Sequence, residues 1–361
     1  MNRQPWHDLA EAFALPLLAL VGSLLLFGVF VWVGGHDPVE VWTLLFVGAF
    51  GDAFSWQNTL QRSAPLMLTA LTVALPARAG LVVIGGEGAL VLGGLACAGL
   101  PYLLPSLQGT AGTALLLLAA ALAGAAWIAL AGALRQFRGV NETISSLLLS
   151  YIAIALFKHW VEGGMRDPAS LNKPSTLPLA DSLRIGGIAG YDVHWGLAWG
   201  VLLCLLAAVW LAYTTHGFAT RVVGGNARAA KLVGLPANRL IITACALGGA
   251  AAGLAGGVEV AAVHASANAS LIAGLGYAGI LVSFVARHQP LAIIPVAILF
   301  GGFGAAGSLL QRRLGLPDAS VQVLLGFAFV LILASEALRG RLLPFSFLPQ
   351  RAPLPTAKVA A

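Results

Sequence analysis

Long apolar runs alternate with short polar connections along almost the whole chain. A helix that crosses a membrane needs about 20 mostly apolar residues, because the hydrocarbon core is about 30 Å thick. The pattern predicts about ten such helices, over residues 13–34, 60–77, 81–104, 112–134, 141–162, 195–213, 240–262, 271–286, 290–310 and 320–338. The third and eighth segments are rich in glycine, which is typical of broken or re-entrant helices. We therefore expect an all-α polytopic membrane protein.

Composition supports this interpretation. The chain is 59% hydrophobic and 9% charged, whereas soluble domains are roughly 45–50% apolar and about 25% charged. A soluble protein of this length could not hide so much apolar surface from water. The first apolar stretch is too long for the core of a cleaved signal peptide, so we expect a retained first span. We expect a single transmembrane domain over residues 1–345, followed by a disordered cytoplasmic tail over 346–361.

The distribution of basic residues predicts the orientation of the chain. Short cytoplasmic loops of membrane proteins are enriched in Lys and Arg, and residues 35–59 hold Asp37, Glu40 and Asp52 but no Lys or Arg. Placing both termini in the cytoplasm puts most bases inside, although Arg312 and Arg313 fall outside. The inside bases are Arg3, Arg78, Arg135, Arg138, Arg221, Arg228, Lys231, Arg239, Arg287, Arg339, Arg341, Arg351 and Lys358. They form no dense stripe, so the net charge of +6 does not indicate nucleic-acid binding.

Glu87 lies inside the third apolar segment and is surrounded by Gly85, Gly86 and Gly88. A carboxylate at membrane depth costs on the order of 2.5–3.5 kcal/mol on insertion scales. The glycines would loosen the helix, and non-helical backbone is tolerated only inside protein or beside a water-filled cavity. Glu87 is therefore either a structural partner for a neighbouring helix or part of a broken helix that lines a pathway.

A polar face opens the fifth segment. Asn141 is a helix amino-terminal cap by type and Glu142 suits the positive end of the helix dipole. Ser146 and Ser150 are four residues apart and share one helix face, with Tyr151 next to them. Such a stripe either bonds neighbouring helices or lines a pore.

The inside loop from Thr214 to Arg239 contains no acidic residue. Asn226 is a candidate cap, 227–233 a short helix, Gly234 its end and Pro236 a stop signal. The positive-inside rule explains the charges of this loop but not a capped helix. The pattern favours a cytoplasmic docking element.

The seventh segment carries two consecutive small-residue steps, Gly249 to Gly253 to Gly257, which are typical of a helix-packing face. Glu259 lies two residues beyond it, and His264 and Asn268 follow. These three polar residues supply either pathway contacts or structural pairs near the outer half of the membrane.

No residue pattern indicates catalysis. The seven histidines are scattered without metal-ligand spacing, and no nucleophile elbow is present. The three cysteines, Cys97, Cys204 and Cys245, each lie in an apolar run and are expected to behave as small hydrophobes. We expect neither an enzyme nor a metal site.

Four blocks, spread over about residues 60 to 338, resemble the permease subunits of bacterial ABC importers for nucleosides and simple sugars. Ribose-type and branched-chain amino acid permeases are the near alternatives. The blocks are AGLVVIGGEGALVLGGLA, VNETISSLLLSYIAIAL, VGGNARAAKLVGL and GYAGILVSFVARHQPLAIIPVAILFGG, in the family's order. Two departures stand where the family has amides: Val83-Ile84 replaces Asn-Ile, and Ser150 replaces Asn. Because of these two departures, the resemblance does not identify the transported solute.

The resemblance implies a type II importer permease of the bacterial inner membrane. It implies a second permease chain, identical or homologous, two cytoplasmic ATPase subunits and a periplasmic or lipid-anchored binding protein. It implies no cofactor in this chain, because the ATPase binds the ATP. The coupling helix that it implies consists of Asn226, Ala227, Arg228, Ala229, Ala230, Lys231, Leu232, Val233, Gly234 and Leu235.

The solute pathway is expected to gather polar and aromatic groups at a central cavity. The candidates are Glu87, Ser146, Ser150, Tyr151, Glu259 and Phe284. Two alternatives to the importer remain. A stand-alone secondary transporter or channel would show paired broken helices, and the second half offers no clear partner for 85–88. A structural scaffold would leave Glu87 and the capped loop unexplained.

Overall fold

The computed structural model describes residues 5–317 and 319–338, with side chains over 14–317 and 319–337. The described part consists of helices and their connections. The α-helices are α1 (Pro5–Val33), α2 (Pro38–Phe50), α3 (Ala53–Arg78), α4 (Gly86–Leu103), α5 (Gly109–Arg138), α6 (Glu142–Glu162), α7 (Gly196–Tyr213), α8 (Thr215–Gly225), α9 (Ala227–Leu232), α10 (Ala237–Val258), α11 (Leu275–Val285), α12 (Pro290–Leu314) and α13 (Ala319–Leu338). A π-helical turn over Glu259–His264 extends α10, and a 3-10 turn over Ala269–Leu271 precedes α11.

Each predicted segment coincides with one helix: α1, α3, α4, α5, α6, α7, α10, α11, α12 and α13. Within the described residues, eight helices are long and apolar enough to cross a membrane by length and composition. The other two matches are α3, which carries more polar residues, and α11, which is short. The prediction of an all-α polytopic protein is confirmed.

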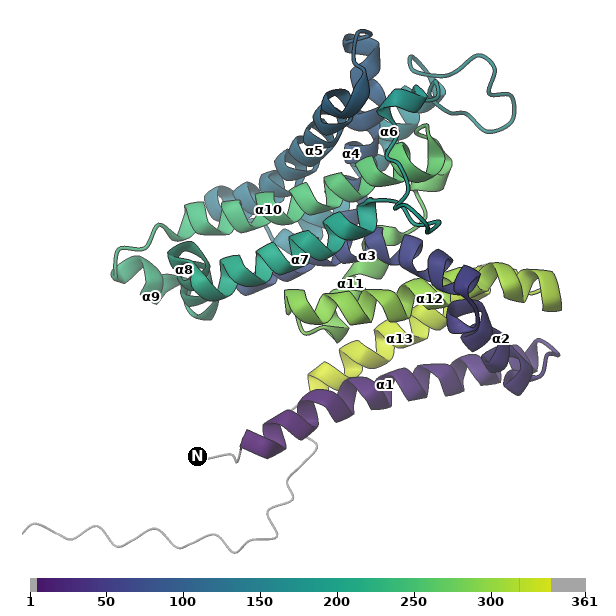
Figure 1. Cartoon of the computed structure of the whole chain (residues 1–361). Coiled ribbons are helices and arrows are strands. Elements are labelled where there is room, and N and C mark those ends of the chain that lie inside the picture. Colours follow the sequence, from purple (N-terminus) through teal and green to yellow (C-terminus); the bar gives the residue numbers. More distant parts are fainter. Residues whose placement is uncertain (1–4, 318, 339–361) are drawn as a thin grey trace, which may run out of the picture.

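The helices form two groups that share α3. Figure 1 shows α4, α5, α6 and α10 in one group and α1, α2, α12 and α13 in the other, with α3, α7 and α11 between them. The α10 helix packs against α5, α4 and α3, whereas α12 packs against α3 and α2, and α1 against α13. The α3 helix is buried along most of its length as a result.

Small residues allow the close packing of α10 on α5. A Cβ atom added at Gly253 would lie 2.1 Å from the carbonyl oxygen of Ala120, and one at Gly249 would lie 2.3 Å from that of Gly124. At Gly257 it would lie 2.9 Å from the Ala120 Cβ. The predicted small-residue face is therefore a helix-packing face, because any larger side chain would separate the two backbones.

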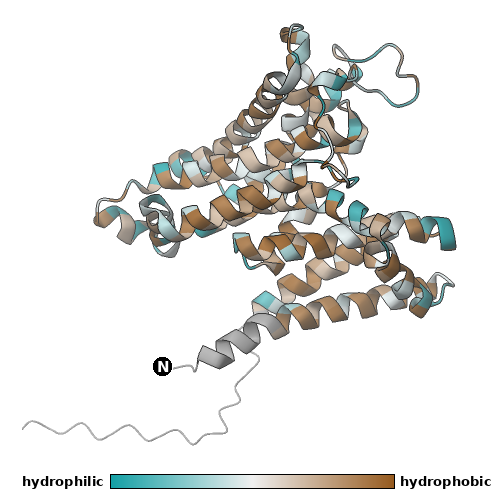
Figure 2. Ribbon diagram, viewed as in Figure 1, coloured by the Kyte–Doolittle hydropathy of each residue, from teal (hydrophilic) through white to brown (hydrophobic). Residues whose placement is uncertain are grey.

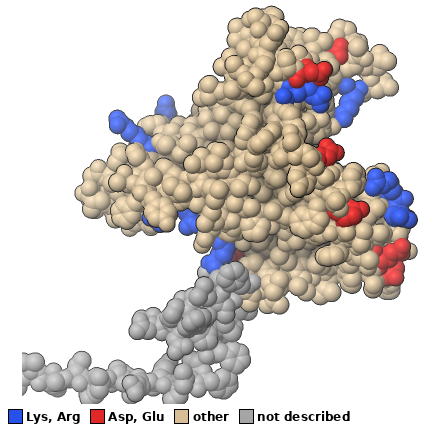
Figure 3. Space-filling model, in the orientation of Figure 1, with Lys and Arg blue, Asp and Glu red and all other residues tan. Residues whose placement is uncertain are grey.

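The surface has the pattern of a membrane-embedded protein. Figure 2 shows hydrophobic residues along the lengths of the helices and hydrophilic ones mainly near the helix ends. Figure 3 shows the Lys, Arg, Asp and Glu side chains of the same face mostly toward those ends, with a wide uncharged band between them. Figure 1 places the start of α1 and the end of α13 on the same side of the molecule as α9.

The structure differs from the sequence prediction over residues 35–59, which were expected to form a loop. Asp37 caps α2 by accepting a hydrogen bond from the Val39 amide at 2.9 Å, and Asp52 caps α3 by accepting one from the Ser55 amide. The apolar run of α2 is too short to cross a membrane, and a pattern of spans of about 20 residues therefore does not predict this helix. The predicted tail over 346–361 lies outside the described residues.

Candidate functional site

The α4 helix begins only at Gly86, because residues 81–85 are not helical. Two serines of α6 accept hydrogen bonds from backbone amides of this region. The Ile84 amide donates to Ser146 Oγ at 3.1 Å, and the Gly88 amide donates to Ser150 Oγ at 3.3 Å. A Cβ at Gly88 would lie 2.6 Å from the Ser150 Cα, so only glycine permits this approach. The serine stripe thus bonds a neighbouring helix whose first turn lacks intrahelical partners.

Glu87 caps the amino terminus of α11. Its side chain is fully buried, and its two carboxylate oxygens accept hydrogen bonds from the Gly274 amide at 2.9 Å and the Gly276 amide at 2.7 Å. A buried carboxylate is tolerated when its oxygens are hydrogen-bonded. The positive end of the α11 dipole stabilises the same charge. This contact joins α4 to α11 across 187 and 189 residues of sequence.

The other end of α11 is also held by side chains. The Arg78 Nε donates to the carbonyl oxygen of His288 at 3.0 Å, and Ser283 Oγ lies 2.9 Å from His288 Nδ1. Arg287 and His288 have φ angles of 53° and 54°, a conformation that is uncommon for residues other than glycine. Burial, and then the neighbouring Arg78 charge, lower the pKa of His288 to about 4. His288 is therefore neutral at pH 7.

A cavity of about 530 Å³ lies beside α11, between α3, α12 and α13. Most of its wall is apolar or aromatic, and the polar side chains that line it are those of Arg62, Tyr277 and Gln322. None of these three side chains makes a hydrogen bond or ion pair with another described residue. The lining consists of Arg62, Leu66, Ile84, Ala273, Gly274, Leu275, Tyr277, Ala278, Ile280, Leu281, Phe300, Gly301, Gly304, Val321, Gln322, Leu325, Gly326 and Phe329.

The structure distributes the predicted pathway residues over several places, and none of the six lines this cavity. Ser146 and Ser150 are buried in the α4–α6 contact, and Glu87 lies behind Gly274, which does line the cavity. Tyr151 is 59% exposed and lies within electrostatic range of Tyr277.

The remaining two candidates lie elsewhere. Glu259 Oε2 is 3.4 Å from His264 Nε2 at the end of α10, and the Phe284 ring packs edge-on against that of His288 at 4.8 Å between centroids. Both contacts are structural pairs. A pathway role for any of the six residues stays a prediction.

Sequence reasoning missed the three polar residues of the cavity. Gln322 interrupts an apolar stretch of the last predicted span, Arg62 lies near the start of the second predicted span between Gln61 and Ser63, and Tyr277 follows Gly276 in the fourth family-like block. A polar residue within an apolar membrane segment is a functional candidate by default. Applied to Arg62 and Gln322, that rule would have selected both, but it would not have shown that they meet.

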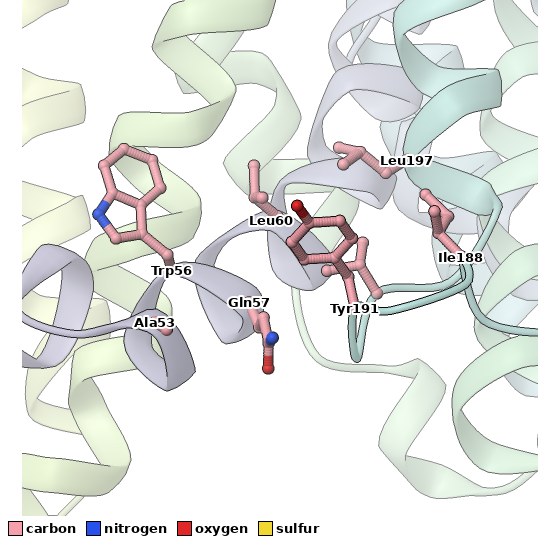
Figure 4. A pocket seen from close by; sticks show the side chains of 8 residues that line it. Ala53, Trp56, Gln57, Leu60, Ile188, Tyr191 and Leu197 are labelled. Carbon is pink, nitrogen blue, oxygen red and sulfur yellow. The ribbon is translucent and has the colours of Figure 1, made fainter.

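A second cavity, of about 400 Å³, lies at the start of α3. Figure 4 shows Trp56 on one side of it and Tyr191, Ile188 and Leu197 on the other, with Gln57 below. Besides the Trp56 and Tyr191 rings, Gln57 is the one side chain with polar atoms among its lining residues. A polar solute would find few partners there, so this cavity is a weaker candidate for the solute site.

The predicted short capped helix is present as α9, and its docking role stays a prediction. Asn226 Oδ1 accepts hydrogen bonds from the Arg228 and Ala229 amides, both at 3.0 Å, and Gly234 ends the turn with a φ of +83°. Leu232 and Val233 point outward and are 88% and 74% exposed. Apolar side chains this exposed mark a contact surface when they lie outside the membrane.

The neighbouring helix α8 connects α9 to the α3–α4 turn. A Cβ atom at Gly224 would lie 2.2 Å from the carbonyl oxygen of Arg78, and one at Gly80 would lie 3.1 Å from that of Gly224. The backbone of α8 is thus in direct contact with the turn that leads to Glu87.

Helices long and apolar enough to cross a membrane, a capped helix (α11) beside a partly polar cavity, and a short exposed helix (α9) in a basic connection are the features of a class, the polytopic transport proteins. A model of the family described as branched-chain amino acid transport system / permease component matches residues 55–333. The chain belongs to that family.

Curated relatives agree with this assignment. The chain is 30% identical over 336 residues to the glucose ABC transporter permease protein TsgB13 of Haloferax volcanii, covering 90% of this chain and 88% of the relative. It is 28% identical over 337 residues to the guanosine ABC transporter permease protein NupP of Bacillus subtilis, covering 90% and 94%. It is also 28% identical over 293 residues to NupQ, a second guanosine ABC transporter permease protein of that organism, covering 78% and 91%.

The chain is therefore a multi-pass ABC transporter permease of the bacterial plasma membrane, and its relatives are transport permeases rather than enzymes. Family membership favours this assignment over a stand-alone secondary transporter or channel.

Proposed function

We propose that this permease imports nucleosides or simple sugars, and that the solute passes the cavity lined by Arg62, Tyr277 and Gln322. The cavity volume of about 530 Å³ lies within the range of about 300–1,000 Å³ that is usual for small-molecule sites. Its aromatic and apolar wall suits a sugar or base face, and its three polar side chains supply hydrogen bonds. Two relatives of this permease are a glucose and a guanosine ABC transporter permease protein.

The observation that carries the proposal is that these polar side chains have no hydrogen-bond or ion-pair partner in the described part of the chain. Arg62 and Gln322 are exposed, and neither has a polar partner among the described residues. Lipid is an unfavourable neighbour for an arginine or a glutamine. The face that bears them is thus suited to meet a water-filled pathway rather than hydrocarbon.

The same face is suited to a second permease chain. Two guanosine permease proteins of one organism, NupP and NupQ, are both similar to this chain, which supports a pair of identical or homologous permeases. In such a pair the exposed polar face would become the inner wall of the pathway. A periplasmic or lipid-anchored binding protein would deliver the solute to it. A pathway role remains part of this proposal for six residues that do not line the cavity of one chain, namely Glu87, Ser146, Ser150, Tyr151, Glu259 and Phe284.

The α9 helix is the proposed contact for the ATPase subunits, two of which would bind the ATP. Leu232 and Val233 give it an apolar tip, and Arg228 and Lys231 surround that tip with positive charge. A soluble partner with an apolar groove and an acidic rim would bury both features. This assignment sets α9, the start of α1 and the end of α13 on the cytoplasmic side.

The experiment is co-purification of the full-length permease with the ATPase subunits from membranes, comparing wild type with a Leu232→Asp, Val233→Asp double variant. Both residues are exposed, so the substitutions should leave the fold intact. Leu171→Asp is the matched control, because Leu171 is 81% exposed but lies in the α6–α7 connection. We expect the ATPase with wild type and control and its loss from the double variant. Recovery of the ATPase with all three would refute the assignment of α9.

A further inference from the structure

The polar side chains of the cavity between α3, α11, α12 and α13 are biased toward hydrogen-bond donors. Arg62 presents five N–H donors and no acceptor, whereas Gln322 and Tyr277 can donate or accept. No Asp, Glu, His or Lys is among the lining residues. The backbone amides of Gly274 and Gly276 are occupied by Glu87. A ligand that presents acceptors is therefore favoured over one that presents donors.

Arg62 reaches the cavity from α3 and has no ion-pair partner among the described residues that would occupy its guanidinium. It is exposed on α3 and lies beside Gly304 of α12, where an added Cβ atom would be 3.7 Å from the Arg62 Cδ and 3.8 Å from an Nη, which are ordinary contact distances. Its guanidinium has no ion-pair partner in the described part of the chain. A guanidinium that is always charged retains its full capacity for a bidentate contact.

The same cavity has aromatic side chains in its wall. Tyr277 from α11 and Phe329 from α13 line the cavity together with Arg62 and Gln322. Aromatic side chains bind other flat rings by stacking. A flat ring that carries two adjacent acceptors on one edge would match both features of the cavity.

We propose that Arg62 makes this permease select 6-oxopurine nucleosides, such as inosine and guanosine, over adenosine. The 6-oxopurine ring presents a carbonyl oxygen beside the N7 acceptor, and arginine pairs with these two atoms bidentately. Adenine presents an amino donor at the position of that carbonyl, so a guanidinium donor would face another donor. The inference rests on the proposed function and narrows its solute class.

The test uses the assembled transporter, with both permeases, the ATPases and the binding protein, reconstituted in proteoliposomes. ATP-driven uptake of radiolabelled inosine and of adenosine is measured separately at saturating binding protein. For wild type we expect inosine to be taken up faster. In Arg62→Ala the inosine-to-adenosine ratio should fall about tenfold, within the range for loss of one bidentate pair.

Two further variants make the result specific. Arg62→Lys keeps the charge but not the planar fork, so the ratio should fall there as well, even if the alanine variant fails to assemble. Arg313→Ala removes an exposed arginine outside the cavity and should leave the ratio unchanged. An unchanged ratio in both Arg62 variants would overturn the proposal.

Uptake by the wild-type transporter distinguishes the selection of 6-oxopurines from the proposed importer function, on which that selection rests. Uptake of hexoses without nucleosides, or preference for adenosine, would overturn the selection of 6-oxopurines and leave the importer function standing. Absence of ATP-driven uptake of any nucleoside or sugar by wild type would overturn both.

Discussion

The Glu87 carboxylate of α4 accepts a hydrogen bond from the Gly276 amide of α11 at 2.7 Å. The contact fixes the start of α11 beside the cavity, because Gly274 and Tyr277, on either side of Gly276, both line it. Three elements therefore depend on one buried carboxylate: the broken start of α4, the amino terminus of α11 and the cavity wall. Its removal should affect the stability of the fold and solute transport together.

Glu87→Gln is expected to destabilise the protein. The amide retains one acceptor oxygen, but its NH₂ group faces the second backbone N–H, so one hydrogen bond and the charge are lost. Hydrogen bonds to charged groups contribute about 1.5–3 kcal/mol, and the cost should fall in that range. Thermal unfolding of the purified transporter in nanodiscs measures the change.

The matched control for this substitution is Glu40→Gln, because Glu40 is exposed in the first turn of α2. We expect its melting temperature to equal that of wild type. If Glu87→Gln also melted like wild type and transported normally, the cap would have no structural importance.

Gly276→Ala should separate α11 from α4. A Cβ atom at residue 276 would lie 2.2 Å from the backbone nitrogen of Glu87 and 2.5 Å from its Cα. Backbone atoms cannot move aside as a flexible side chain does, so the cost should be at least the 1–3 kcal/mol typical of overpacking. Gly225→Ala is the control, since nothing lies within 4 Å of its added Cβ. Equal melting temperatures for the two variants would contradict the packing described.

Ser146→Ala combined with Ser150→Ala tests what the serine stripe does. Loss of both hydroxyls leaves the Ile84 and Gly88 amides without partners, and an unsatisfied buried donor costs about 1–3 kcal/mol. We expect a lower melting temperature and an unchanged KM for the solute. Ser308→Ala removes a hydroxyl that bonds only within its own helix and should be nearly neutral. A raised KM with normal stability would instead favour a pathway role for the two serines.

The spans could be read from the sequence because bilayer thickness fixes the length of an apolar helix. The caps Asn141 and Asn226 were also readable, since their side chains act within three residues. The partner of Glu87 was not, because Gly274 and Gly276 lie far away in sequence and no local pattern specifies that pairing. The cavity was missed for the same reason: Arg62, Tyr277 and Gln322 come from three separate helices.

Acidification should weaken the turn between α11 and α12. His288 has an ordinary pKa of about 6.5 when unfolded and one of about 4 in the folded protein. Between these values the unfolded chain binds more protons, so stability falls as pH drops from 6.5 toward 4. In His288→Asn this contribution is absent, and asparagine tolerates the positive φ at this position.

Melting temperatures at pH 7 and pH 5 measure this effect. The drop should be smaller in His288→Asn than in wild type, whereas His36→Asn, in the α1–α2 connection, should retain the wild-type drop. An equal drop in all three proteins would show that His288 is already protonated at pH 5 in the folded state.

ATP-driven uptake into proteoliposomes that contain the permease pair, the ATPases and the binding protein tests the central claim most directly. We predict nucleoside or sugar uptake that requires ATP, persists when ionophores collapse ion gradients, and is lost with Leu232→Asp, Val233→Asp. Uptake by the permease alone, without ATPase subunits and abolished by ionophores, would contradict the account.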